Sequence, residues 1–145
     1  VVSLAGKPIA RAGSVAALKK YKLGAPIGTT SYKAITDVVK PGPKPAVYDT
    51  LNDGVTALQN GQIDGLVVDL PTAFYITAAQ IENGAIVGQL PAIGGRQERF
   101  GLVLGKDSLL TECIDNALSR LRAEGALEKL VGTWLARSAG APILR

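Results

Sequence analysis

Two short polar segments of the sequence could bind a small ligand through opposite charges. The first, Gly28-Thr29-Thr30-Ser31, lies where an expected strand turns into the N-terminus of an expected helix. A glycine lets the backbone approach a ligand, while free N–H groups and the helix dipole favour an anion such as a carboxylate or phosphate. The hydroxyls of Thr30 and Ser31 add hydrogen-bond donors. In the simpler alternative, Thr29 or Thr30 only caps the helix.

The second is Asp69 itself, which follows the most hydrophobic expected strand, Ile63 to Val68. Ligands of open α/β sheets bind outside the carboxyl ends of strands, so an acid here is placed to hold a cation. Asp69 also stands two residues before Pro71, where its side chain could cap the next helix instead. If both segments bind ligand, an anion site and a cation site lie at neighbouring strand ends. An amino-acid zwitterion needs both.

The elements that position these segments follow from the alternation of strand-like and helix-like stretches. This pattern predicts an α/β fold with a mostly parallel five-stranded sheet flanked by helices, followed by C-terminal helices. Strands are expected at 22–27, 46–49, 63–68, 85–90 and 100–104, and helices at 15–21, 29–40, 52–59, 71–80 and 107–136. The last stretch predicts two helices with apolar stripes, separated at Gly125. Cys113 is expected as a small core residue of the first, and the tail 138–145 as frayed.

The composition excludes several functional classes. The 145 residues are 47% hydrophobic and 19% charged, which is typical of a globular domain. No histidine and one cysteine, Cys113, exclude most zinc sites, histidine-dependent triads and an intrachain disulfide. The formal charge of +4 forms no basic stripe, and no apolar run is long enough to span a membrane. We therefore predict no metal, no cofactor and no nucleic-acid partner, and we expect any export signal to lie outside this chain.

Several segments, taken in order, resemble the family 3 extracellular solute-binding proteins. These are the amino-acid receptors of ABC importers, with the type II periplasmic-binding-protein fold. The resemblance rests on Lys22 to Ser31, on Tyr48 to Asp53 followed by Ala57 to Thr72, and on Phe100 to Leu104 with Leu118 to Trp134. It covers nearly the whole chain in order and spacing.

The resemblance implies that two lobes close on one amino acid and that a membrane permease reads this hinge closure. In the family, the threonine matching Thr30 helps to hold the ligand's α-carboxylate, and the aspartate matching Asp69 holds the α-ammonium. Positions matching Pro26 and Val68 often face the ligand's side chain, and both are apolar here. The expected protein is extracytoplasmic, either periplasmic or lipid-anchored, and not an enzyme. Its expected ligand-binding residues are Pro26, Gly28, Thr29, Thr30, Ser31, Val68 and Asp69.

The resemblance also implies a division of the chain. Residues 1–6 would form a hinge strand, residues 7–98 lobe 2, and residues 99–145 the second hinge crossing and the C-terminal helices of lobe 1. The first part of lobe 1, which carries the family's carboxylate-binding arginine, has no counterpart in this sequence. Because the apolar stripes of the last two helices would then lack their usual partner, we expect the chain to form a homo-oligomer through them.

Two other functions stay open on the sequence alone. An amino-acid sensor domain of a receptor would bind its ligand in the same way and would carry a transmembrane helix beyond Arg145. Some dehydratases share the fold, and Asp69 or Glu98 could then act as a general acid or base. The absence of histidine counts against the enzyme. The sequence does not predict which amino acid is bound.

Overall fold

The computed structural model describes residues 1–95, 100–133 and 141–145. The chain divides into two compact units, one formed by Val1–Arg96 with Ala141–Arg145 and the other by Gln97–Gly140. The boundary expected between residues 98 and 99, the candidate acid Glu98 and the aromatic Trp134 all lie outside the described residues.

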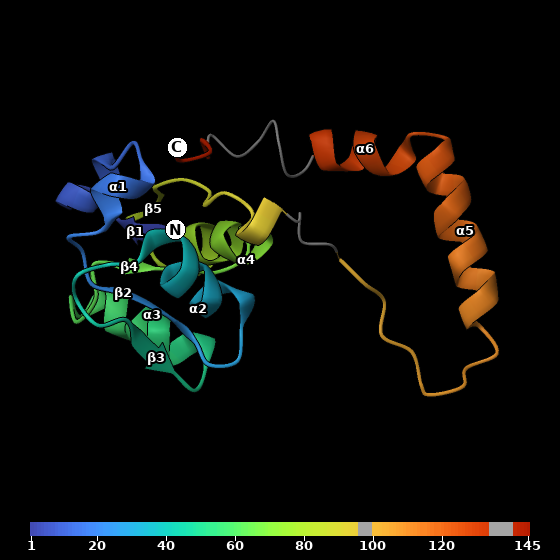
Figure 1. Cartoon of the computed structure of the whole chain (residues 1–145), viewed down its shortest axis with the longest axis horizontal. Coiled ribbons are helices and arrows are strands. Elements are labelled where there is room, and N and C mark those ends of the chain that lie inside the picture. The colour runs from blue at the N-terminus through green and yellow to red at the C-terminus, as the bar shows by residue number, and fades with distance from the viewer. Residues whose placement is uncertain (96–99, 134–140) are drawn as a thin grey trace. The chain divides into compact units, whose positions relative to one another are not determined.

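The first unit is built on a five-stranded sheet (Figure 1). Its strands are β1 (Val2–Leu4), β2 (Leu23–Pro26), β3 (Ala46–Tyr48), β4 (Gly65–Leu66) and β5 (Gly84–Ile86), in the order β3-β2-β4-β1-β5. β2 pairs in parallel with β3 and β4, whereas β1 is antiparallel to both β4 and β5. Four strands therefore run in one direction and β1 runs against them, which confirms the predicted mostly parallel sheet.

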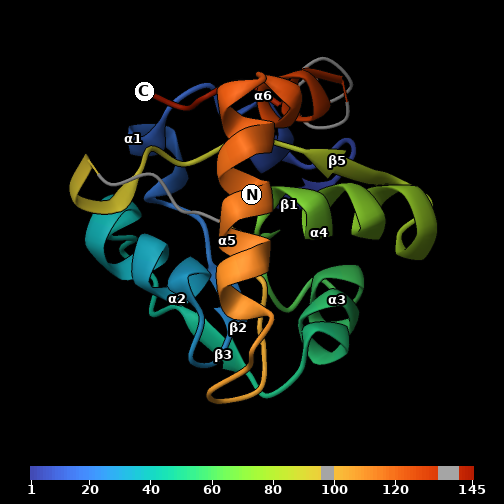
Figure 2. The same ribbon diagram turned by 90° about the vertical axis from the view of Figure 1, so that its right-hand side faces the viewer.

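Helices cover both faces of this sheet, with α1 and α2 on one side and α3 and α4 on the other (Figure 2). Their bounds are Val15–Leu18 for α1, Thr30–Ala34 for α2, Leu51–Gln59 for α3 and Leu70–Tyr75 for α4. Single π-helical turns, η2 (Ile35–Val39) and η3 (Ile76–Gln80), extend α2 and α4, and short 3₁₀ turns lie at η1 (Pro8–Arg11) and η4 (Ile93–Gly95). Hydroxyl groups cap three of these helices: Ser14 caps α1, Thr29 caps α2, and Thr50 caps α3 in a capping box with Asp53.

The core consists of two apolar clusters, one on each face of the sheet. Side chains alternate between the faces of a strand, so Leu66 enters one cluster and its neighbour Val67 enters the other. The close packing of α3 on β4 depends on Gly54, because a Cβ at that position would lie 2.8 Å from Leu66 Cδ1. The register of β4, which leads into the second candidate segment, is therefore fixed by tight packing from both sides.

The second unit contains α5 (Thr111–Ala123) and α6 (Ala126–Val131). They are separated at Gly125, whose φ of 70° lies in the left-handed region, which confirms the predicted break. None of the residues of α5 or α6 is buried. Cys113 is exposed, so its prediction as a core residue is wrong, because no other layer covers α5 in the described part of this unit.

Two further predictions from the pattern are wrong. Residues 100–104 form no strand, and Val103 is 97% exposed, because a strand needs a neighbour to pair its backbone groups and none is present in the described part of this unit. The end of the sequence is not frayed over residues 141–145, since Leu144 is 1% exposed and joins the first core cluster. Among the described residues, no helix is both long and apolar enough to cross a membrane.

Candidate functional site

The two candidate segments follow the carboxyl ends of the adjacent parallel strands β2 and β4. These ends lie at the same edge of the sheet. β2 and β4 pair with Leu23 opposite Gly65 and Gly24 opposite Leu66. The ladder is extended by the Val67 N–H group, which donates to the Gly24 carbonyl oxygen at 2.8 Å. Continuing this register by two residues brings Pro26 level with Val68. The loops that follow them, with Gly28 to Ser31 on one side and Asp69 on the other, therefore start side by side.

In the first segment the backbone turns at Gly28, and Thr29 then caps α2. The φ of Gly28 is 70°, in the left-handed region that glycine adopts at no steric cost. The Thr29 hydroxyl donates to the Pro26 carbonyl oxygen at 2.7 Å, and its Oγ1 accepts a hydrogen bond from the Tyr32 N–H at 3.3 Å. Of the two threonines considered as caps, the structure thus assigns this role to Thr29.

The cap at Thr29 leaves the donors of the next two residues available. Thr30 is exposed and Ser31 is half-buried, and within the described parts of the chain neither hydroxyl has a hydrogen-bond partner. Their backbone N–H groups are in the first turn, where an α-helix provides no acceptor. The first turn also contains no acidic residue. Four donors on two adjacent residues are therefore available to an anion, with no acidic side chain in the same turn.

Asp69 is the N-cap of α4. The alternative that its side chain caps this helix is therefore confirmed. Its Oδ1 accepts a hydrogen bond from the Thr72 N–H at 3.0 Å, and its Oδ2 accepts one from the Thr72 hydroxyl at 2.8 Å. An ionised carboxylate has about four acceptor positions, of which these two bonds use half. Asp69 is also exposed. Capping therefore leaves this side chain able to accept further hydrogen bonds from an ammonium group.

The apolar positions of the site lie partly in the core. Pro26 and Val68 are both half-buried, and Val68 packs against the second core cluster. Between Pro26 and Gly28, however, Ile27 is 62% exposed, although it is large and apolar. Ile27 was not among the residues predicted from the sequence to bind ligand. Its position between Pro26 and Gly28, which were both predicted, could have indicated it.

A second residue that the sequence reasoning passed over is Asp49. It follows β3, whose Tyr48 pairs with Pro26, and it is exposed at the same edge of the sheet. The rule that singled out Asp69, an acid at the carboxyl end of a parallel strand, applies equally to Asp49. The edge thus carries two carboxylates, one on each side of the donor segment after β2.

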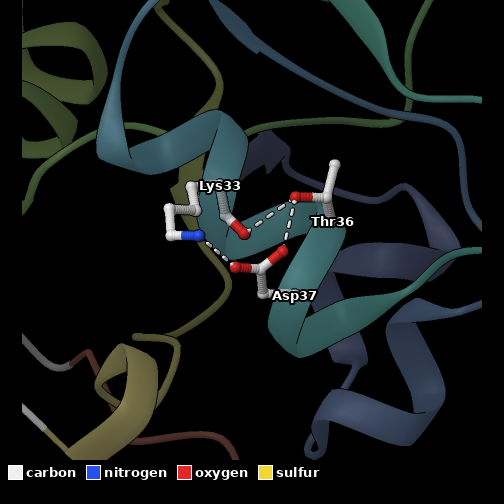
Figure 3. A network of polar contacts seen from close by, with 3 residues as sticks. All are labelled: Lys33, Thr36 and Asp37. Carbon is white, nitrogen blue, oxygen red and sulfur yellow. Dashed lines mark hydrogen bonds and ion pairs between the residues drawn. The ribbon is translucent and has the colours of Figure 1, made fainter.

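The lysine of α2 is engaged within its own helix (Figure 3). Lys33 Nζ lies 2.6 Å from Asp37 Oδ2, and the Thr36 hydroxyl donates to Asp37 Oδ1 at 3.0 Å. The hydrogen bonds from Lys33 and Thr36 lower the pKa of the exposed Asp37 carboxyl below its ordinary value. Because Lys33 is paired with Asp37, the groups that the N-terminus of α2 offers to an anion are N–H and hydroxyl groups rather than this ammonium.

Two cavities in the described parts of the chain are lined by residues outside the candidate segments. A small one of about 30 Å³ lies beside Leu58, Ile63 and Asp64 in the first unit. A wide hollow of about 510 Å³ lies along α5, beside Leu109, Cys113 and Arg120 of the second unit. Neither cavity includes a residue of the candidate site, where Thr30 and Asp69 are exposed.

No known family model matches the chain, but individual proteins do. It is 32% identical over 107 residues to the glutamate-binding protein GluB of Corynebacterium glutamicum, an alignment that covers 72% of this chain and 36% of that protein. It is 30% identical over 122 residues to the ABC transporter arginine-binding protein 1 of Escherichia coli, covering 81% of this chain and 48% of that protein. The chain therefore spans half or less of the length of these curated relatives.

The fold is also found among solved structures. An ancestral arginine-binding protein bound to glutamine superposes with a TM-score of 0.64 at 26% identity, covering 94% of this chain and 58% of that protein. An ancestral arginine-binding protein bound to arginine superposes with a TM-score of 0.60 at 26% identity, covering 92% of this chain and 58% of that protein. The resemblance noted in the sequence thus extends to the arrangement of the strands and helices.

Proposed function

Because its homologues and structural neighbours are solute-binding proteins of amino-acid ABC transporters, we propose that this chain is part of the substrate-binding component of an amino-acid importer. It supplies the lobe that binds the ligand's α-carboxylate and α-ammonium groups. One observation carries the proposal: the donors of Thr30 and Ser31 and the carboxylate of Asp69 follow adjacent parallel strands at one edge of the sheet.

The chemistry of this edge matches the part that all α-amino acids share. The N–H and hydroxyl groups of Thr30 and Ser31 donate to the α-carboxylate, helped by the dipole of the helical segment that they begin. The free acceptor positions of Asp69 take hydrogen bonds from the α-ammonium. Gly28 lets the ligand approach the backbone, Thr29 fixes the turn, and Pro26 and Val68 offer an apolar surface to the ligand's side chain.

The wider assembly follows from the same proposal. Residues 1–6 form a hinge strand, residues 7–98 lobe 2, and residues 99–140 the second crossing and helices of lobe 1, whereas Ala141–Arg145 return to the first unit. A second surface then closes over the open edge, and a membrane permease reads the closed state outside the cytoplasm, with the receptor periplasmic or held at the cell surface by a lipid anchor. Binding and release involve no catalytic step. Glutamate, arginine and glutamine, which appear in the names of the relatives and neighbours, are the first ligands to test.

Variants of Thr29 and Thr30 distinguish a role in capping the helix from a role in binding the ligand. Thr30→Ala removes a hydroxyl that the proposal assigns to the ligand's carboxylate, so we expect affinity to fall about 10-fold with an unchanged melting temperature. Thr29→Ala removes the cap and lowers the free energy of unfolding by about 1 kcal/mol, while the donors of Thr30 remain. Calorimetric titration and thermal melts measure both. The reverse pattern, with binding sensitive to Thr29 alone, contradicts the role given to Thr30.

We also propose that the chain self-associates through its second unit. Leu110, Leu121 and Leu130 are 60%, 41% and 54% exposed, so large apolar side chains on α5, α6 and the turn before them contact water. Association of two copies is the simplest way to bury them. Light scattering at micromolar concentration should give a mass above that of one chain, and Leu121→Glu with Leu130→Glu should return it to the monomer. A wild-type chain that is already monomeric contradicts the proposal.

A further inference from the structure

The segment Ala141–Arg145 is bound to the first unit by main-chain hydrogen bonds. Gln89 and Ile143 form a parallel bridge, in which the Gln89 N–H donates to the Pro142 carbonyl oxygen and the Leu144 N–H donates to the Gln89 carbonyl oxygen, both at 2.8 Å. The Gln89 side-chain amide adds a third bond, to the Ala141 carbonyl oxygen at 2.9 Å. At the other end, the Val15 N–H donates to the Arg145 carbonyl oxygen at 3.2 Å. The segment is thus held in an extended pairing with Gln89 that forms a single parallel β-bridge.

The side chains of this segment alternate as they do in a half-buried strand. Ile143 is 65% exposed, whereas Leu144 is 1% exposed and belongs to the first core cluster with Val87. Main-chain pairing combined with one buried apolar anchor is how extended peptides are recognised at sheet edges. The residues that follow β5 therefore act as a receptor for a short apolar strand.

Gly88 is matched to this strand. A Cβ at position 88 would lie 2.7 Å from Leu144 Cγ and Cδ2 and 2.8 Å from the Pro142 carbonyl oxygen, all closer than real Cβ contacts. The φ of Gly88 is not positive, so its backbone conformation does not require a glycine. Position 88 has no room for a side chain because Leu144 and Pro142 occupy that space. The glycine therefore allows the segment Ala141–Arg145 to pack closely against Gly88.

We propose that Val87–Gln89 is a docking edge for the strand Ala141–Arg145, and that this strand is a releasable strap. Docking of the strap closes the chain between the two paired segments into a loop. Release of the strap opens this loop. Four hydrogen bonds and one buried leucine hold the strap, so it opens at a lower free energy than the strands of the sheet.

Amide hydrogen exchange on the whole chain tests the strap. In the wild type, the amides of Gln89 and Leu144 should be protected, but less than those of β2 and β4. Gly88→Ala should lower the protection of Gln89 and Leu144 by about 10-fold or more, whereas Gly13→Ala, where an added Cβ meets nothing within 4 Å, should not. Leu144→Ser should act like Gly88→Ala, and Ile143→Ser, at the exposed neighbouring position, should leave protection unchanged.

Two results would overturn the proposal. If Gly88→Ala and Leu144→Ser leave exchange at Gln89 unchanged, the docking edge does not hold the strap. If they reduce the protection of β2 and β4 as much as that of Gln89, the segment is an inseparable part of the core and not a releasable strap.

Discussion

Asp69→Asn is expected to weaken amino-acid binding by about 100-fold or more while the first unit stays folded. An ammonium group that loses a charged, hydrogen-bonded partner on desolvation costs about 3 kcal/mol or more, which corresponds to that loss of affinity. The cap should survive, because asparagine keeps an oxygen that accepts the Thr72 N–H and caps helices about as well as aspartate. Calorimetric titration gives the affinity, and a thermal melt without ligand gives the stability.

Two further variants make this result specific. Asp69→Ala removes both functions, so it should lose binding and also about 1 kcal/mol of stability. Asp49→Asn makes the same change of charge at the end of β3, and we expect an effect on affinity below about 3-fold, since long-range charge effects at exposed positions are screened. If Asp69→Asn binds as tightly as the wild type and only Asp69→Ala is impaired, Asp69 is a cap and nothing more.

Leu66→Ala is expected to give a large loss of stability, about 2–5 kcal/mol. Leu66 is fully buried in the second core cluster on β4, and its Cδ1 fills the space left by Gly54 on α3. The melting temperature should fall by roughly 10 °C or more for a unit of this size. Because β4 leads directly into Asp69, ligand binding should be lost together with the fold.

The matched control is the same substitution at an exposed leucine. Leu109 is 97% exposed, so Leu109→Ala should change the unfolding of the first unit by less than about 0.5 kcal/mol. Guanidinium titration followed by circular dichroism compares the two variants. Equal losses at Leu66 and Leu109 would contradict the description of the core.

The sheet and its helices could be predicted because their signals are local. Strand-like runs with helix-like stretches between them gave four of the five strands, and Gly125 marked the break between α5 and α6. The candidate site was also visible locally, as hydroxyls and a carboxylate at strand ends. The choice between Thr29 and Thr30 as the cap was not, because both have the same side chain. The backbone turn at Gly28 decides it by placing the Thr29 hydroxyl over the Tyr32 N–H.

The predictions that failed depend on distant partners. Residues 100–104 have the composition of a strand, but a strand forms only where another can pair with it. Leu144 looked like part of a frayed tail because its burial depends on Gly88 and Gln89, which lie far away in the sequence. Cys113 has the character of a core residue, yet it is exposed and none of the residues of its helix is buried. Local patterns do not contain this information.

The most direct measurement of the central claim is an NMR titration of the chain with arginine, glutamine and glutamate at millimolar concentrations. The account predicts that at least one of them shifts the amide signals of Thr30, Ser31 and Asp69, and that Asp69→Asn abolishes the change. Acetate and butylamine, which each carry one of the two charged groups, should produce much smaller shifts. If no amino acid shifts these three signals, or if the shifts occur on another part of the sheet, this edge is not an amino-acid site.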